Sequence, residues 1–165
     1  MKKIMFCFII ASLIISGCSQ NVVKRENQPD IYLVENENKE MNQAIQKTKE
    51  NLSIFIKELS KNNNEYTNLL LKARFEEGEK IEHMWVSDIT YSSSTFMGIL
   101  SNEPMYVKNL SYGDIVFVNK NQVSDWMIVK EDGTVIGGYT LRVLRNRMTQ
   151  KEREEFDKST GYKFE

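Results

Sequence analysis

The sequence predicts an α+β fold, and three observations support it: an amphipathic helical stripe, a series of alternating segments and a helix-capping signal near the C-terminus. The stripe lies between Asn38 and Lys61, where apolar positions recur at spacings of four and three, the period of one helix face. We therefore expect a long N-terminal amphipathic helix, an antiparallel sheet of about five or six strands, and short C-terminal helices. The stripe consists of Met41, Ile45, Thr48, Leu52, Phe55 and Leu59. It favours a face packed on the core and leaves dimerisation open.

Beyond Glu65 the period changes to two, as in a half-buried strand. The clearest hairpin pairs Asp125–Lys130 with Thr134–Ile136 across Asp132-Gly133, a dipeptide typical of a type I′ turn. The other predicted strands are Leu69–Phe75, Lys80–Tyr91, Thr95–Leu100 and Ile115–Val118.

Gly137-Gly138 ends the predicted sheet, and the segment 139–148 fits helical and strand spacing alike. The run Thr149-Gln150-Lys151-Glu152 has the pattern of a capping box, because a threonine and a glutamate three residues later can satisfy each other's backbone amides. We expect a last short helix from Gln150 to about Lys158.

The N-terminus predicts a processed and lipid-anchored protein. Lys2 and Lys3 precede an apolar stretch of about a dozen residues, which is shorter than the roughly 20 that span a bilayer. The run Ile15-Ser16-Gly17-Cys18 resembles the lipobox of bacterial lipoprotein precursors, in which the cysteine receives the lipid. The resemblance implies a signal peptide over residues 1–17. An ordinary secretory signal cleaved nearby, or an uncleaved anchor, is the alternative.

Three segments follow from this interpretation: the signal over 1–17, the lipidated Cys18 with a polar tether over 18–29, and one domain over 30–165. Two or three acyl chains, palmitate among them, would hold the protein durably at a membrane of the cell envelope. Ser19 after the cysteine resembles the sorting pattern for the outer membrane, if the bacterium has two membranes. We expect a partner protein in the envelope.

Charge disfavours nucleic acid as a partner. The chain has 22 basic and 23 acidic residues, and removal of 1–17 takes away Lys2 and Lys3 but no acid. The remaining charge of about −3 provides no basic footprint. If Cys18 is lipidated, no thiol is left, because Cys7 is removed with the signal.

Catalytic signatures are few. His83 is the only histidine, so a zinc site with several nitrogen or sulfur ligands is not expected. A Ser-His-Asp triad would have to use His83, but no G-x-S-x-G motif accompanies it. No nucleotide-binding glycine motif occurs, and we expect no metal, no cofactor and no assigned catalytic residue. Four carboxylates could in principle pair as acid and base, as glycosidases require, although such residues more often form turns or face solvent. They are Glu82, Asp88, Asp114 and Asp125.

Three blocks remain: Glu82 to Val86, Ser124-Asp125-Trp126, and Gly137 to Arg145. Together with Gly98, the Asn102-Glu103-Pro104 break and Gly113-Asp114, they resemble the YegJ-like family of small bacterial proteins. The resemblance covers the chain from about Asp30 to the tail at Phe156–Phe164. It implies an α+β domain, and it implies no activity, substrate or cofactor.

The functional interpretation of these blocks is a ligand face on one concave side of the sheet. Its residues are His83, Trp85, Asp125, Trp126 and Arg142. Aromatic rings with one arginine and one carboxylate suit a peptide or a small anionic ligand. The structural interpretation is favoured over this ligand face, with both tryptophans in the core and Arg142 near a helix end.

Two functions fit these features. The favoured one is a non-catalytic binding module at the membrane, either an immunity-type protein that blocks a toxin or an accessory subunit of an envelope complex. The alternative is a small carboxylate-dependent hydrolase that acts on cell-wall material.

Overall fold

The structure is a computed structural model that describes residues 22–23, 31–32, 39–61 and 65–164. The chain divides into two compact units, Met1–Leu33 and Val34–Glu165. In the first unit, β1 (Val22–Val23) and β2 (Ile31–Tyr32) form a two-stranded antiparallel sheet. The predicted signal and Cys18 lie outside the described residues, and the predicted tether is described only at β1. The predicted boundary at residue 30 stays a prediction.

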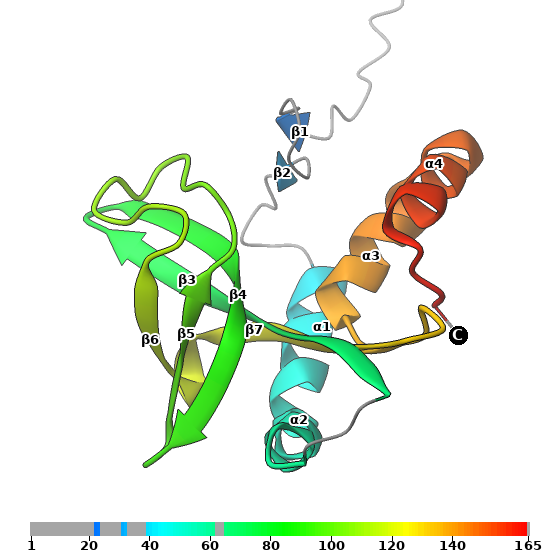
Figure 1. The fold of residues 1–165 in the computed structure, drawn as a ribbon. Helices are drawn as coiled ribbons and strands as arrows, with labels where there is room; N and C mark the ends of the chain where they lie inside the picture. The colour runs from blue at the N-terminus through cyan, green and yellow to red at the C-terminus, as the bar shows by residue number, and fades with distance from the viewer. Residues whose placement is uncertain (1–21, 24–30, 33–38, 62–64, 165) are drawn as a thin grey trace, which may run out of the picture. The chain divides into compact units, whose positions relative to one another are not determined.

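The second unit contains four short α-helices and a six-stranded antiparallel sheet (Figure 1). None of the helices in the described part of the chain is long and apolar enough to cross a membrane. The helices are α1 (Lys39–Glu50), α2 (Leu52–Leu59), α3 (Tyr139–Arg147) and α4 (Gln150–Thr160), with a short 3₁₀ turn η1 (Lys120–Gln122) between strands.

The predicted long N-terminal helix is wrong, because the helical segment is broken at Asn51 into α1 and α2. Asn51 has φ −101° and ψ 6°, outside helical geometry. Its Nδ2 donates to the carbonyl of Lys47 at 2.9 Å, so the side chain offers the backbone a local alternative to continued helix. The apolar stripe is nevertheless buried at Thr48 and Phe55, which are both fully inaccessible.

The sheet has the strand order β6-β5-β4-β3-β7-β8. Alternation along β3 follows the expected pattern, with Leu71, Ala73 and Phe75 buried. The strands are β3 (Tyr66–Glu77), β4 (Lys80–Ser92), β5 (Thr95–Leu100), β6 (Ile115–Asn119), β7 (Val123–Lys130) and β8 (Val135–Gly137).

The β7–β8 hairpin forms, but its turn is not type I′. Such a turn needs positive φ at both central residues, whereas in this hairpin only Gly133 has it, at +87°. The amide of Gly133 donates to Lys130 O at 2.9 Å, and Lys130 N donates to Thr134 O at 3.0 Å. This three-residue loop places glycine at the bulge position that follows an ordinary turn.

Two apolar layers cover different parts of the sheet. On one face, Leu71, Val86, Phe96 and Trp126 pack with Phe55 of α2 in the main core. On the other face, a smaller cluster forms over β7 and β8, where α3 and the C-terminal tail cover the strands. This cluster joins Met127, Val129 and Val135 to Leu70, Trp85, Leu141, Tyr162 and Phe164.

The ambiguous segment 139–148 is a helix over Tyr139–Arg147. The capping box that begins α4 is present, because Glu152 N donates to Thr149 Oγ1 while Thr149 N donates to the Glu152 carboxylate. After α4, Gly161 adopts φ +69° and the tail turns back to pair in parallel with the chain before β8, through Thr134 and Lys163.

Candidate functional site

Asp125 is a fully buried carboxylate on β7. Its two oxygens accept hydrogen bonds from three elements of the fold: its own strand, the first turn of α3, and α1. The donors are Trp126 N (2.8 Å), Tyr139 N (3.0 Å), Thr140 N (2.8 Å), Leu141 N (3.3 Å), Thr140 Oγ1 (2.6 Å) and Thr48 Oγ1 (3.3 Å). Its oxygens are therefore committed to the fold.

The local sequence explains why α3 needs this distant carboxylate. Its N-cap is Gly138, which has no side chain to accept from the free amides of the first turn, and those amides are normally satisfied by a cap. Asp125 supplies the missing acceptor, and its charge is favourable at a helix N-terminus. Burial raises the pKa of Asp125, while hydrogen bonds from Thr140 and the charge of Lys72 oppose the rise.

Trp126 is also fully buried. Its indole Nε1 donates to the carbonyl of Thr48 at 3.1 Å. The ring stacks on Phe55 with 5.6 Å between centroids and meets the edge of Tyr139 at 5.7 Å. Trp126 is therefore a core anchor that joins the sheet to α1, α2 and α3.

His83 lies on β4 and contacts Ser124, with 2.8 Å between Nδ1 and Oγ. Desolvation, together with the charges of Lys72 and Arg74, lowers the pKa of His83 to about 4. The imidazole is thus neutral near pH 7. Ser124 is only 3% exposed and its hydroxyl also donates to Lys72 O at 3.3 Å, so the pair offers no accessible nucleophile.

Trp85 is half-buried on the same side of β4 as His83. The ammonium of Lys72 lies 5.6 Å from the centre of its ring, an attractive cation–π geometry. Burial lowers the pKa of Lys72, and the nearby charge of Asp125 opposes this. The backbone amide of Trp85 donates to Asn102 Oδ1 at 2.6 Å.

Arg142 projects from α3 back onto the end of the sheet. Its Nε donates to Gly137 O at 2.9 Å and its Nη2 to Val135 O at 2.8 Å. The guanidinium also lies 5.1 Å from the centre of the Phe164 ring. These contacts fasten the C-terminal tail to the β8–α3 connection.

The structure therefore does not bring the five predicted ligand-face residues onto one open surface. Asp125 and Trp126 are enclosed, Arg142 holds the tail, and His83 and Trp85 remain together on β4. The role of His83 and Trp85 in a ligand face stays a prediction.

The carboxylates considered for hydrolysis each accept hydrogen bonds from other residues of the fold. Glu82 is 7% exposed and accepts the amides of Met105, Tyr106 and Val107, which holds the loop after β5. Asp114 accepts from Ser111 N and Asp88 from Ser87 Oγ. Among the described residues, no group of three or more histidines, cysteines or carboxylates is arranged to hold a metal ion.

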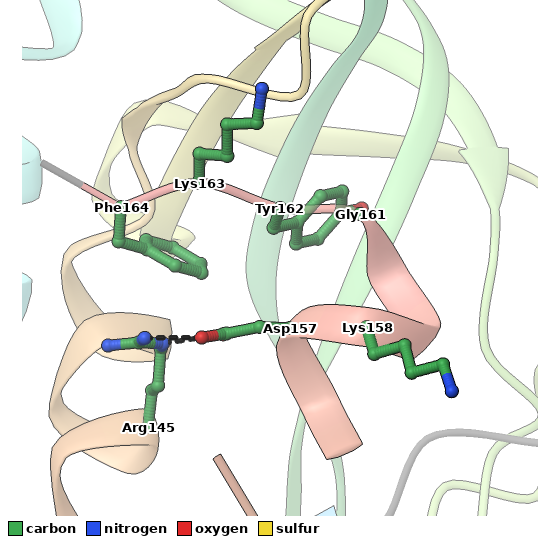
Figure 2. Close-up of a pocket in the computed structure, with 7 residues that line it drawn as sticks. All are labelled: Arg145, Asp157, Lys158, Gly161, Tyr162, Lys163 and Phe164. Carbon is green, nitrogen blue, oxygen red and sulfur yellow. Dashed lines mark hydrogen bonds and ion pairs between the residues drawn. The ribbon is translucent and has the colours of Figure 1, made fainter. Parts of the chain in front are cut away.

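The C-terminal pocket is an open hollow of about 490 Å³ between α3, α4 and the tail (Figure 2). It combines aromatic rings, cationic side chains and one carboxylate, the combination considered for a ligand face on the sheet. Its lining residues are Arg145, Asp157, Lys158, Gly161, Tyr162, Lys163 and Phe164. The alternating aromatic and cationic residues at 162–164 are the sequence signal that could have indicated it.

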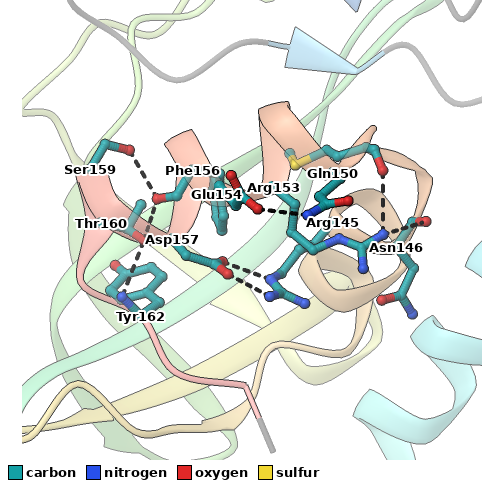
Figure 3. Close-up of polar contacts among 11 residues, drawn as sticks. Arg145, Asn146, Gln150, Arg153, Glu154, Phe156, Asp157, Ser159, Thr160 and Tyr162 are labelled. Atoms are coloured by element: carbon teal, nitrogen blue, oxygen red, sulfur yellow. Dashed lines mark hydrogen bonds and ion pairs between the residues drawn. The ribbon is translucent and has the colours of Figure 1, made fainter.

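A bidentate ion pair forms one wall of this pocket. Arg145 Nε lies 2.7 Å from Asp157 Oδ1, and Nη2 lies 2.5 Å from Oδ2 (Figure 3). The hydrogen bonds from Arg145 lower the pKa of Asp157 and hold it ionised. Arg145 also lies 5.4 Å from the centre of the Phe164 ring. Lys158 and Lys163 are exposed at the rim.

The family described as "Uncharacterized protein conserved in bacteria (DUF2314)" matches residues 38–164, the whole C-terminal pocket included. The chain belongs to this family. Uncharacterized protein YegJ of Escherichia coli (strain K12) is 32% identical over 115 residues, which are 70% of this chain and 73% of that protein. The resemblance to YegJ-like proteins is therefore confirmed.

A second relative is longer. The "Putative ankyrin repeat protein" of Neisseria meningitidis serogroup B is 34% identical over 142 residues, which are 81% of this chain and 56% of that protein. The chain thus spans little more than half the length of this relative. No solved structure matches the chain.

The first prediction concerns Asp125. We expect Asp125→Ala to lower the free energy of unfolding by about 3 to 5 kcal/mol, because the buried donors of α3 and α1 lose their acceptor. Urea denaturation followed by circular dichroism measures the loss. Asp132→Ala is the matched control, since Asp132 accepts only from Thr134 in an exposed turn. Equal losses in the two variants would contradict the capping role.

The second prediction concerns pH. Because the pKa of His83 falls from 6.5 to about 4 on folding, the unfolded chain binds a proton between these values and the folded chain does not. Stability from this residue is therefore present above pH 6.5 and lost as the pH falls towards 4. Between pH 6.5 and 4, the free energy of unfolding of His83→Gln should fall less than that of the wild type. The difference between the two should be small, because solvent screens the exposed imidazole. Parallel pH profiles would refute the shift.

Proposed function

We propose that this protein is a lipid-anchored binding module of the bacterial cell envelope, which holds an acidic segment of a partner protein at its C-terminal pocket. Binding without catalysis is the function that these features support best. An immunity-type protein and an accessory subunit are two forms of this role, and the identity of the captured protein distinguishes them.

The observation that carries the proposal is the composition of the pocket wall. Tyr162 and Phe164 supply apolar rings, while Lys158 and Lys163 carry positive charge beside the pocket, with side chains that extend away from the Arg145–Asp157 pair (Figure 2). The single carboxylate of the lining, Asp157, is already neutralised by Arg145. The pocket thus has excess positive charge beside aromatic surface, which complements carboxylates on an extended peptide and steers them to the site.

The same geometry argues against hydrolysis at this place. A general acid near neutral pH needs a raised pKa, whereas the pKa of Asp157 is lowered by Arg145. Asp125 and Glu82 are enclosed and accept several structural hydrogen bonds each. To act as an acid or base, either carboxylate would have to give up these hydrogen bonds. The donors would then be left buried without an acceptor, and the fold would be destabilised.

The name of the Neisseria relative offers further support. Ankyrin repeats form extended binding surfaces, and a protein named for them contains a region similar to this chain. A domain joined to such repeats is most simply a recognition element. We extend this to the present chain as part of the proposal.

The anchor rests on the run that ends at Cys18. Lipid on this cysteine would keep the domain close to the membrane, where binding to a nearby partner benefits from high effective concentration.

The third prediction tests the anchor. Cys18→Ala should abolish incorporation of a labelled fatty acid in cells and leave an unprocessed precursor, because no other thiol follows the signal. Cys7→Ala is the matched control and should label like the wild type. Label in the Cys18→Ala protein would overturn the anchor assignment.

The fourth prediction tests the pocket. The lipid-modified chain, crosslinked in membranes and purified, should recover an envelope protein whose contact segment is acidic. Lys158→Glu with Lys163→Glu should reduce that recovery roughly tenfold, because the substitutions turn attraction into repulsion.

Lys47→Glu with Lys49→Glu provides the control, since it reverses the same charge on exposed positions of α1. It should leave recovery unchanged. If both double variants behave alike, net charge rather than the pocket would govern capture, and the proposed binding site would be wrong.

A further inference from the structure

The two edge strands of the six-stranded sheet differ in whether another segment of the chain pairs with their outer side. At the β8 edge the C-terminal tail supplies hydrogen bonds, from Val135 N to Lys163 O at 3.0 Å and from Lys163 N to Gly133 O at 2.8 Å. At the opposite edge, β6 pairs only with β5 among the described strands. Figure 1 shows β6 on the far side of the sheet from α3 and α4.

The sequence of β6, Ile-Val-Phe-Val-Asn, has none of the features that protect an edge strand. It carries no charge, no proline and no bulge, and strands of this type pair readily with another chain. The exposed edge of β6 is therefore a candidate site for pairing with a strand of another chain.

Register identifies which backbone groups of β6 point outward. Leu100 N donates to Asp114 O at 2.9 Å, so in the alternating antiparallel pattern Gly98 pairs through hydrogen bonds with Val116. The intervening residues Ile115 and Phe117 therefore direct their amides and carbonyls away from β5.

The side chains of the same residues are open to solvent. Ile115 and Phe117 are each 67% exposed, and Met97, the partner of Phe117 on β5, is 41% exposed. Because directly paired residues share a face, these three form one apolar surface next to the edge.

We propose that β6 pairs antiparallel with β6 of a second copy of this chain, about a twofold axis at Phe117. This register places Phe117 opposite its own copy and Ile115 opposite Asn119. One step outside the strand it places Asp114 opposite Lys120 of the second copy, twice by symmetry. Both residues are exposed, so the edge is self-complementary in charge. Within one copy the ammonium of Lys120 lies 5.3 Å from the centre of the Tyr91 ring.

The interface is small, and this limits its strength. Asn119 N already donates to Gln122 Oε1 at 2.9 Å, so the new hydrogen bonds concentrate around Phe117. Confinement of both copies to one membrane would favour such a contact. The C-terminal pockets lie at the opposite edges of the joined sheet, so the dimer leaves two binding sites free.

The test is sedimentation equilibrium of the full lipid-modified chain in detergent micelles, with circular dichroism to verify the fold. Phe117→Lys should weaken dimerisation roughly tenfold, because like charges would meet across the axis. Ile81→Lys is the matched control and should leave dimerisation unchanged, since Ile81 is an exposed apolar residue of β4, away from β6.

A charge swap tests the register itself. Asp114→Lys should weaken the dimer by placing two cations together, and the further change Lys120→Asp should restore it. A monomeric wild type, a dimer insensitive to Phe117→Lys, or a swap without rescue would each overturn the proposal. The last two results would indicate that the copies associate through face-to-face packing or another interface. A monomer whose β6 pairs with a strand of another protein would indicate that this protein is the partner.

Discussion

The fold depends on one buried carboxylate that satisfies three elements at once. Asp125 accepts from its own strand, from the uncapped start of α3 and from Thr48 on α1. A charge placed in the interior is costly unless it is paired or hydrogen-bonded, and here the amides of α3 have no other acceptor at Gly138. The buried carboxylate without its donors, and the helix amides without their acceptor, would each be unfavourable. Their hydrogen bonds therefore hold the sheet, α1 and α3 together.

The need to satisfy buried backbone groups determines which polar side chains remain accessible to a ligand. Two of the carboxylates considered in the sequence as acid and base, Asp125 and Glu82, are enclosed and hold backbone groups or loops in place. The C-terminal pocket, in contrast, presents the exposed cationic side chains Lys158 and Lys163 beside Phe164. A buried polar network and an accessible binding surface make opposite demands on a side chain, because the first requires every hydrogen bond to be made and the second requires some to be available.

The sheet is asymmetric for a related reason. The tail after Gly161 pairs beside β8 and brings Phe164 beneath the guanidinium groups of Arg142 and Arg145. The same tail thus protects one edge and builds the pocket. The β6 edge receives no such cover within the described chain, and Ile115 and Phe117 beside it are exposed.

The sequence by itself determined what depends on near neighbours. Alternation at Leu71, Ala73 and Phe75 indicated β3, and the Thr149–Glu152 pattern indicated α4, because strand faces and capping boxes are set by residues two to three positions apart. Only the tertiary structure decided the role of Asp125, since its acceptor function arises from α3 arriving beside β7 after the hairpin. It also decided the position of the pocket, because this depends on which rings and charges of α3, α4 and the tail folding brings together.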